Sequence, residues 1–226
     1  MAIVVDNSPG AALCSYCSAT TRGAALCAGC QRSLPWNHCA CPGCARPQIH
    51  PAPCPACLKK PLPFDRAWAA FRLEAPVQQS VHRLKYRAGL DQARLLGALM
   101  GQRLAQRPQP LPALVIPVPL HDTRLMRRGY NQALELAHGM QRVLDIEVDA
   151  GAARRLRRTR DQIGLNPAQR RRNVHEAFAV DARVAGRHIA LLDDVMTTGA
   201  TLADLARAAR HAGAARIEAW ALARAT

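Results

Sequence analysis

The residues best suited to chemistry are cysteines, and all nine of them fall between Cys14 and Cys57. Eight form C-x2-C pairs, and each unit of two pairs encloses nine residues: Cys14/Cys17 with Cys27/Cys30, then Cys41/Cys44 with Cys54/Cys57. The segment is therefore a duplicated C-x2-C-x9-C-x2-C unit with a ten-residue spacer. Two tight turns that each carry two thiolates can close a tetrahedral zinc site. We expect two structural zinc ions, with disulfides or an iron–sulfur cluster as the alternatives.

The spacing leaves the pairing of these units open. In a tandem arrangement each unit closes its own site, whereas a crossed arrangement would join the first pair of one unit to the first pair of the other. The equal gaps favour the tandem arrangement. Cys39, next to His38, is left over, and we expect a bystander thiol rather than a substitute ligand. Four thiolates leave no open position on zinc, so we expect a structural role rather than metal catalysis.

A second group of reactive side chains stands in the run Leu191-Leu192-Asp193-Asp194-Val195-Met196-Thr197-Thr198-Gly199-Ala200-Thr201. A buried strand here would deliver two carboxylates to the carboxyl edge of a sheet, where ligands bind in open α/β folds. The small-residue turn then opens a helix whose free N–H groups can cradle an anion. Carboxylates for a diol or Mg²⁺ beside a phosphate cradle suit a ribose 5-phosphate. The run is not a Walker loop, and the alternative is an ordinary capped helix.

Arginine gathers in residues 154–172, which contain eight arginines and one acidic residue, Asp161. This basic segment supplies almost half of the chain's net charge of +15. Arginine binds phosphate through two parallel hydrogen bonds, so the segment suits a lid over pyrophosphate or a track for a nucleic-acid backbone. The alternative is a solvated basic loop. The segment has no aromatic residue, so stacking on single-stranded DNA would need another source, such as Trp36.

These groups must be positioned by a core that is poor in aromatic residues, which make up 4% of the 226 residues against 49% for all apolar types. Apolar periodicity predicts strands at 67–71, 114–119, 146–148, 188–192 and 215–223, and helices at 77–86, 90–106, 131–143 and 201–212. Alternating strands and helices predict an α/β fold with a parallel sheet. A linker at 58–63 marks the expected boundary between a double zinc ribbon (1–60) and the α/β domain (61–226).

The location of the protein is predicted from features that the sequence lacks. No run approaches the roughly 18–20 apolar residues that a membrane span needs. The first six residues have neither the basic region nor the apolar length of a signal peptide. We therefore expect a cytoplasmic protein without membrane insertion, in which the cysteines are thiols.

The run from Leu191 to Thr201 resembles the phosphoribosyl pyrophosphate (PRPP) motif of type I phosphoribosyltransferases. Together with the duplicated cysteine unit and the intervening Arg128-Gly129-Tyr130-Asn131-Gln132, it resembles the ComF family, whose members are linked to DNA uptake in natural competence. The resemblance covers nearly the whole chain, with its motifs in the same order. It implies a type I phosphoribosyltransferase-like parallel sheet flanked by helices and preceded by a small Cys-rich zinc-ribbon module.

The resemblance also implies ligand roles. Asp193 and Asp194 would hold the ribose hydroxyls and serve catalysis. The 5-phosphate would be held by Thr197, Thr198, Gly199, Ala200 and Thr201, and Val195 and Met196 would complete the PRPP-binding motif. The pyrophosphate loop would follow Pro117, Val118 and Pro119, with Arg127 or Arg128 nearby. A mobile hood, or a contact with nucleic acid, would come from Arg158, Thr159, Gln162, Arg170, Arg171 and Asn173, with Phe178 completing the family's pattern. Tyr130 stands where Phe is common in the family, a mild departure.

Two functions follow from these expectations. The first is a PRPP-binding protein associated with competence DNA uptake, with single-stranded DNA and DNA-uptake proteins as partners. The alternative is a Mg²⁺-dependent phosphoribosyltransferase that acts on an unknown nucleophile and has no DNA role. There, Mg²⁺ and arginine would neutralise the departing pyrophosphate. The sequence does not identify a general base; His121 is a candidate, and His175 and His188 are weaker ones.

Overall fold

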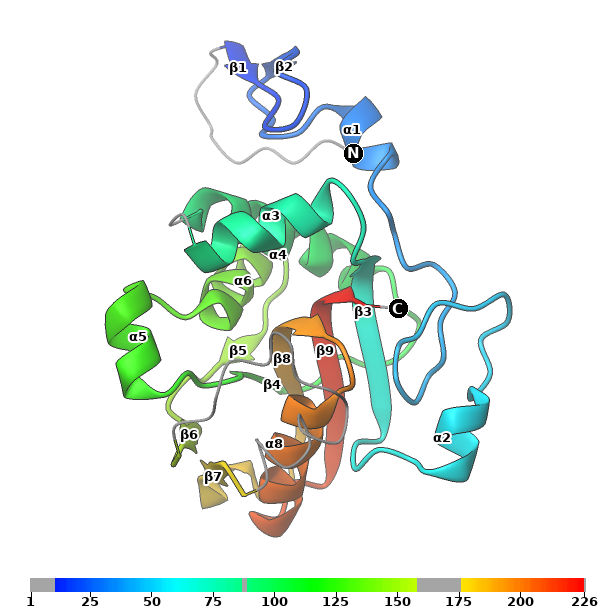
Figure 1. Cartoon of the computed structure of the whole chain (residues 1–226), viewed down its shortest axis with the longest axis vertical. Coiled ribbons are helices and arrows are strands. Elements are labelled where there is room, and N and C mark those ends of the chain that lie inside the picture. Colours follow the sequence, from blue (N-terminus) through cyan, green and yellow to red (C-terminus); the bar gives the residue numbers. More distant parts are fainter. Residues whose placement is uncertain (1–10, 87–88, 158–175, 226) are drawn as a thin grey trace.

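The core of the molecule is a five-stranded sheet in the order β3-β9-β8-β4-β5, in which every neighbouring pair is parallel. The computed structural model describes residues 11–86, 89–157 and 176–225 (Figure 1). The strands of the sheet are β3 (Arg66–Arg72), β4 (Leu114–Pro117), β5 (Glu147–Val148), β8 (His188–Met196) and β9 (Arg216–Arg224). The predicted α/β class with a parallel sheet is therefore confirmed.

Helices cover both faces of this sheet (Figure 1). Three helices, α3 (Val77–Tyr86), α4 (Leu90–Ala105) and α6 (Gln132–Gln141), lie on one face. The helix α8 (Ala200–His211) lies on the other, where it packs with Leu191 and Ile217. Because β8 and β9 are buried on both faces, each contains a continuous apolar run rather than an alternating pattern: residues 189–192 and 219–223.

The helices α4 and α6 approach each other closely because each has a glycine at the contact. A Cβ at Gly97 would lie 2.1 Å from the carbonyl oxygen of Leu136, and a Cβ at Gly139 would lie 2.3 Å from that of Arg94. A side chain at either position would force the helices apart. Close backbone packing thus supports a core with few aromatic side chains, of which Trp220 and Phe71 are the largest that are fully buried.

The Cys-rich segment contains β1 (Ala11–Leu13), β2 (Thr20–Arg22), α1 (Ala28–Arg32) and α2 (Pro55–Lys59). Its middle part pairs with β3, the edge strand of the sheet: the backbone N–H of Asn37 donates to the carbonyl of Ala70 (2.9 Å), and that of Arg72 donates to Pro35 (2.8 Å). Trp36 and Phe71 form an antiparallel bridge there. The segment therefore covers an edge that would otherwise expose unpaired backbone groups. The domain boundary at residue 60 stays a prediction.

Two differences from the sequence-based expectation affect the site. The strand β8 continues to Met196, pairing with the equally long β9 through Met196 and Arg224, so Asp193 and Asp194 lie inside the strand rather than after it. The chain also forms elements that apolar periodicity did not predict, because they are short: α5 (Asp122–Arg128), β6 (Ala153–Arg155), β7 (Phe178–Val180) and a 3-10 turn, η1 (Ala182–Val184).

Among the residues that the structure describes, no helix has both the length and the apolar character needed to cross a bilayer.

Candidate functional site

The β8–α8 loop brings carboxylates and a helix start together at the carboxyl end of β8. Asp193 Oδ1 accepts a hydrogen bond from the backbone N–H of Asp194 at 2.8 Å. Gly199, with φ of +74°, is the N-cap residue of α8, a backbone conformation that residues with a side chain rarely adopt. The backbone N–H of Ala200 turns toward the Thr198 hydroxyl at 3.3 Å. The loop therefore has the predicted strand–carboxylate–turn–helix arrangement.

Lys85, on the last turn of α3, points at this pair of carboxylates. Its Nζ lies 3.2 Å from Asp194 Oδ2, and the side chains are 29% and 13% exposed. Burial lowers the pKa of Lys85, but the charges of Asp194 and Asp193 outweigh burial, so the net shift is upward. The ammonium therefore stays charged. Sequence reasoning missed this residue, because no spacing relates a lysine at the end of one helix to a distant strand.

Asp193 is held in an environment that disfavours its charge. Burial is the largest cause and the charge of Asp194 the second, and together they raise the pKa of Asp193 to about 7. The adjacent backbone N–H and Lys85 act in the opposite direction. A carboxyl group poised near neutral pH can accept or donate a hydrogen bond to a ligand hydroxyl.

The Arg128–Gln132 run connects two segments of the site by hydrogen bonds. The Tyr130 hydroxyl donates to the carbonyl oxygen of Leu84, and Gln132 Nε2 reaches the same oxygen at 3.4 Å. Asn131 Nδ2 donates to the Val118 carbonyl at 3.0 Å. The run therefore ties the end of α3, which carries Lys85, to the turn that follows β4. This positioning role was not predicted.

The expected pyrophosphate turn lies next to the carboxylates. Pro117 pairs with Leu192 across β4 and β8, and the N–H of Val118 donates to the Leu192 carbonyl at 2.8 Å. Arg128 lies close enough to Lys85 to lower its pKa. The ligand roles of Arg127 and Pro119 stay predictions.

The described part of the basic segment reaches the same site. Burial and the charge of Arg124 lower the pKa of Arg155 to about 10, while the charge of Asp193 acts in the opposite direction. The Arg155 guanidinium lies 5.2 Å from the centre of the Phe178 ring. The hood residues expected from the resemblance lie outside the described residues: Arg158, Thr159, Gln162, Arg170, Arg171 and Asn173.

The histidine candidates for a general base have other partners. His121 caps α5, with its Nδ1 at 3.3 Å from the N–H of Thr123 and 3.0 Å from the Thr123 hydroxyl. His188 begins β8, at the opposite end of the strand from Asp193, and its Nε2 lies 3.2 Å from Glu218. His175 lies outside the described residues.

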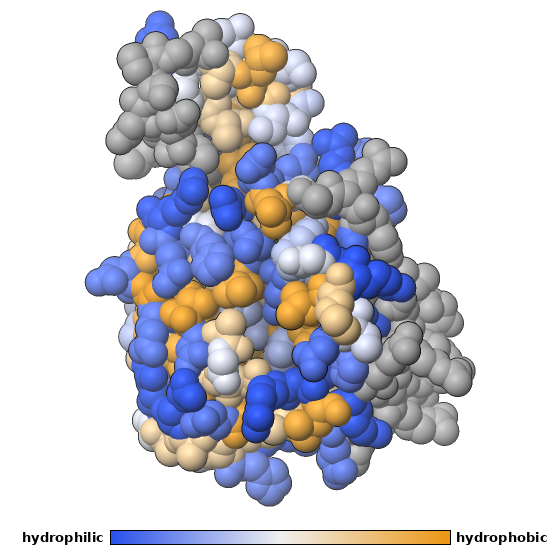
Figure 2. All heavy atoms as spheres, turned by 90° about the vertical axis from the view of Figure 1, so that its left-hand side faces the viewer, coloured by the Kyte–Doolittle hydropathy of each residue, from blue (hydrophilic) through white to orange (hydrophobic). Residues whose placement is uncertain are grey.

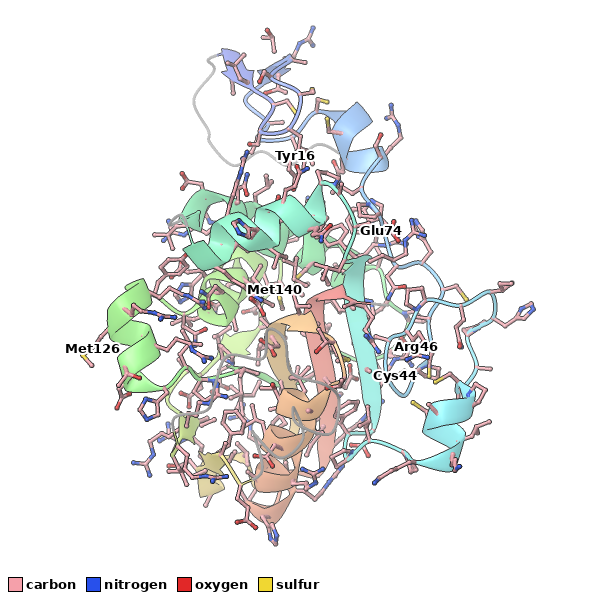
Figure 3. All side chains as sticks on the ribbon, in the orientation of Figure 1. Tyr16, Cys44, Arg46, Glu74, Met126 and Met140 are labelled. Carbon is pink, nitrogen blue, oxygen red and sulfur yellow. The ribbon has the colours of Figure 1, made fainter. Side chains whose placement is uncertain are left out.

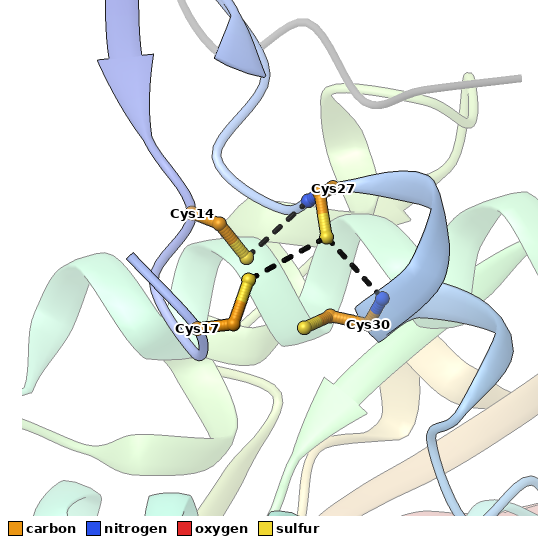
Figure 4. A group of neighbouring side chains, drawn as sticks. All are labelled: Cys14, Cys17, Cys27 and Cys30. Carbon is orange, nitrogen blue, oxygen red and sulfur yellow. Dashed lines mark hydrogen bonds between the residues drawn. The ribbon is translucent and has the colours of Figure 1, made fainter. Parts of the chain in front are cut away.

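The eight paired cysteines gather into two clusters of four, which follow the tandem arrangement. In each cluster the four Sγ atoms lie within 4.8 Å of one another, and the sets are Cys14, Cys17, Cys27 and Cys30 (Figure 4), then Cys41, Cys44, Cys54 and Cys57. Cys39 belongs to neither cluster, and its Sγ donates to the carbonyl of Ile49 at 3.2 Å.

The donor set of each cluster fits a structural metal. The N–H of Cys27 points at Cys14 Sγ (3.4 Å), and at the matching position of the second unit the N–H of Cys54 points at Cys41 Sγ (3.2 Å). Burial raises the pKa of Cys14, but backbone N–H groups, led by that of Cys27, lower it to about 6 overall. Such N–H groups favour thiolates, the form that binds metal. Both clusters are compatible with structural zinc.

Comparison with known proteins gives relatives along nearly the whole chain, although no protein-family model matches it. The DNA utilization protein YhgH of Salmonella typhi is 35% identical over 204 residues, covering 88% of this chain and 90% of the relative. The protein of the same name from Escherichia coli K12 is 34% identical over 206 residues, with the same coverage. Competence protein F of Haemophilus influenzae is 35% identical over 211 residues, again covering 88% and 90%.

Solved structures give weaker matches. A glutamine PRPP amidotransferase from B. subtilis has a TM-score of 0.43 and 18% identity, covering 63% of this chain and 30% of its own. An allosteric regulatory enzyme of purine biosynthesis has a TM-score of 0.38 and 20% identity, covering 57% and 25%. The sequence relatives are decisive, since they are more than 30% identical over nine-tenths of their length. The chain belongs to the ComF family, together with Competence protein F and DNA utilization protein YhgH.

Proposed function

We propose that this protein binds PRPP at the β8–α8 loop and takes part in handling single-stranded DNA during DNA uptake. The observation that supports the first part is the juxtaposition of Asp193, Asp194 and Lys85 with the start of α8. Carboxylates can accept hydrogen bonds from ribose hydroxyls, and the N–H groups at the start of a helix favour a phosphate.

Each group of the site has a distinct task in this proposal. Asp193 and Asp194 hold the ribose hydroxyls, and the backbone from Thr197 to Thr201 holds the 5-phosphate. The ammonium of Lys85 neutralises Asp194 in the free protein and turns toward the pyrophosphate when the ligand arrives. Mg²⁺, entering with PRPP, would supply positive charge for the pyrophosphate oxygens. Arg128 and Arg155 add further positive charge to the same side of the site.

The DNA part of the proposal is supported by the names of the relatives, which refer to DNA utilization and to competence. It is also supported by a group of arginines on two elements and just beyond the second: Arg124, Arg127 and Arg128 on α5, Arg154 and Arg155 on β6, and Arg157 after it. Of these, Arg128 and Arg155 act on the charges of Lys85 and Asp193. Figure 2 turns the face with α5 toward the viewer, where strongly hydrophilic side chains surround smaller apolar areas. The apolar Met126 on α5 is 76% exposed and points away from the body of the protein (Figure 3).

The cysteine clusters supply the structural part of the function. We propose that each holds one zinc ion and that residues 1–60 form a double zinc ribbon beside the domain formed by 61–226. Zinc would contribute the folding energy that a segment with few large apolar residues lacks. A cytoplasmic location, where thiols stay reduced, belongs to the same proposal.

PRPP binding is tested by isothermal titration calorimetry in Mg²⁺ buffer. Asp194→Asn removes one charge from the site and should weaken PRPP binding by about tenfold or more. The control, Asp145→Asn, changes an exposed aspartate and should bind as the wild type does. Absence of PRPP binding by the wild-type protein would contradict the proposal. Pyrophosphate release, assayed with a panel of bases and amines, separates binding alone from phosphoribosyl transfer.

DNA binding is tested through its dependence on salt. Because each phosphate contact releases counterions, the affinity for single-stranded DNA should fall steeply and linearly in a plot of log K against log salt. Replacing Arg154, Arg155 and Arg157 by Gln should weaken binding and reduce the slope, whereas Arg22→Gln on the distant β2 should change neither. A flat plot would contradict a backbone-contact mode of binding.

A further inference from the structure

Arg224, the last residue of β9, joins the second cysteine cluster to the β8–α8 loop. Its side chain is buried, with 4% exposed. Its Nε donates to the carbonyl oxygen of Cys44 at 2.8 Å, and its Nη1 donates to that of Met196 at 3.0 Å and to Ala225. One guanidinium therefore contacts the backbone of a cluster cysteine and the last residue of β8. The β8–α8 loop (residues 197–199), called the phosphate loop below after its proposed role, begins there.

Leu62 makes a second, independent connection between the same two regions. It packs against the buried cysteines of the second cluster, Cys41, Cys44 and Cys54. It also lies at the other end of the phosphate loop, since a Cβ at Gly199 would be 3.4 Å from Leu62 Cδ1. The second cluster thus contacts both ends of the loop, through Arg224 at Met196 and through Leu62 at Gly199.

The geometry of this connection makes it sensitive to metal. The hydrogen-bond partners of Arg224 among the described residues are carbonyl oxygens, and one of them belongs to Cys44. A metal ion bound by Cys41, Cys44, Cys54 and Cys57 would fix the turn that carries this carbonyl. Loss of the metal would release the turn, so Arg224 and Leu62 would lose fixed partners next to the loop.

The first cluster has a different position. It lies above α3, where the Tyr16 hydroxyl is 2.9 Å from that of Ser80 (Figure 3). Cys44, in contrast, lies beside β3 (Figure 3), and its carbonyl oxygen accepts from Arg224, the last residue of β9. The two clusters repeat the same chemistry, but the described contacts link only the second to the phosphate loop.

We propose that metal bound by Cys41, Cys44, Cys54 and Cys57 holds the phosphate loop in its binding geometry, with Arg224 as the positioning residue. The loop itself needs no metal ligand for this role. The effect on PRPP affinity rests on the proposed function, whereas the effect on the order of the loop does not.

The first test compares the clusters through matched variants. Cys54→Ser and Cys27→Ser each change the third cysteine of a unit, and both residues cap a five-residue helix. Each variant should lose one zinc ion per chain in elemental analysis. Amide hydrogen exchange in residues 196–202 should rise at least about tenfold in Cys54→Ser and stay within twofold of wild type in Cys27→Ser. Equal exchange in both variants would overturn the proposal.

The second test leaves all cysteines in place. Arg224→Met keeps the length of the side chain without its donors, and Arg216→Met changes the first residue of the same strand as a control. Arg224→Met should retain two zinc ions. It should raise the rate of amide hydrogen exchange in residues 196–202 and weaken PRPP binding about tenfold. Unchanged exchange and affinity in Arg224→Met would overturn the proposal, even if Cys54→Ser fails to fold. If wild type does not bind PRPP, only the proposed function fails, because loop exchange still decides the coupling.

Discussion

Each end of the central sheet holds a carboxylate, one fully buried and one half-buried, and the surroundings of the two differ. Near the start of β9, Glu218 is fully buried and accepts hydrogen bonds from Arg107 through both oxygens, at 2.7 and 2.8 Å. Trp220 Nε1 adds a third at 2.9 Å. Burial raises the pKa of Glu218, yet Arg107 outweighs it, so the net shift is downward. At the carboxyl end of β8, burial and Asp194 raise the pKa of Asp193 to about 7.

The difference separates a structural carboxylate from one that is available to a ligand. Glu218 is surrounded by donors that belong to the protein, so it has no capacity left for another molecule. Among the described contacts, Asp193 accepts one hydrogen bond from a backbone N–H, and its neighbour Asp194 forms an ion pair with Lys85. A site that binds a polar ligand needs carboxylate oxygens that can still accept hydrogen bonds, because the ligand supplies the donors.

The largest expected effect comes from replacing Glu218, the carboxylate whose hydrogen bonds are all made within the protein. Glu218→Gln removes the charge that compensates Arg107, whose side chain is 10% exposed, and leaves a buried cation whose remaining described partners are the carbonyl oxygens of Gln109 and Pro110. We expect a loss of about 3–5 kcal/mol in the free energy of unfolding, measured by urea denaturation. PRPP affinity of the folded variant should not change, since Glu218 lies at the opposite end of the sheet from the loop.

An exposed ion pair provides the control for that measurement. Glu74 pairs with Arg72 at 3.2 Å, but the two side chains are 51% and 43% exposed. Glu74→Gln should therefore cost less than about 1 kcal/mol. Similar losses in the two variants would show that Glu218 is not the structural group that its hydrogen bonds indicate.

The second prediction concerns the pH dependence of stability at the ligand end. Asp193 has a pKa of about 7 in the folded protein against an ordinary value of 3.8. Between these values the folded state holds a proton that the unfolded state has released, so Asp193 lowers stability as pH rises from about 4 to 7. Asp193→Asn should remove this slope. Its stability relative to wild type should be higher at pH 8 than at pH 5, by on the order of 2 kcal/mol.

Urea denaturation at both pH values measures this difference. Glu218 should show the opposite slope, because its lowered pKa contributes stability that is lost as pH falls through the acidic range. If Asp193→Asn and wild type differ by the same amount at both pH values, Asp193 has an ordinary pKa and the contrast between the two ends disappears.

The third prediction separates binding from stability at Lys85. Lys85→Met keeps the apolar part of the side chain and removes the charge next to Asp194. We expect PRPP affinity to fall about tenfold, or about 1.4 kcal/mol, because the site loses a cation that would face the pyrophosphate. Calorimetry checks this value, with Lys59→Met on the exposed end of α2 as the control. Unchanged affinity would assign Lys85 a purely structural role.

Much of the molecule could be predicted from the sequence because the decisive patterns are local. The tandem cysteine clusters follow from equal spacing within each unit, and the strand–turn–helix around Asp193 follows from an apolar run, two carboxylates and small residues. Helices α3, α4, α6 and α8 follow from apolar periodicity. Each of these features depends on neighbours in the chain, which a single sequence displays directly.

The remaining features depend on contacts between distant segments. Lys85 meets Asp194, and Arg224 meets Cys44, only because the parallel sheet brings their segments together. The length of β8 is likewise set by its partner β9, so its apolar run alone gave an end four residues too early. Short elements such as α5 are stabilised by caps at His121 and Gly129 rather than by periodicity. No pattern within one segment of the sequence predicts such a distant partner.

The smallest expected effect tests a long-range contact of this kind. The Tyr130 hydroxyl donates to the carbonyl of Leu84, next to Lys85, and Tyr130 is the residue that departs from the family's common Phe. Tyr130→Phe should cost about 0.5–1 kcal/mol in the free energy of unfolding, since one hydrogen bond is lost while Gln132 still reaches the same carbonyl. PRPP affinity should fall less than about threefold, as calorimetry would measure. A loss as large as that of Lys85→Met would mean that the Tyr130 hydroxyl holds Lys85 in place by itself, and that family members with Phe position this lysine in another way.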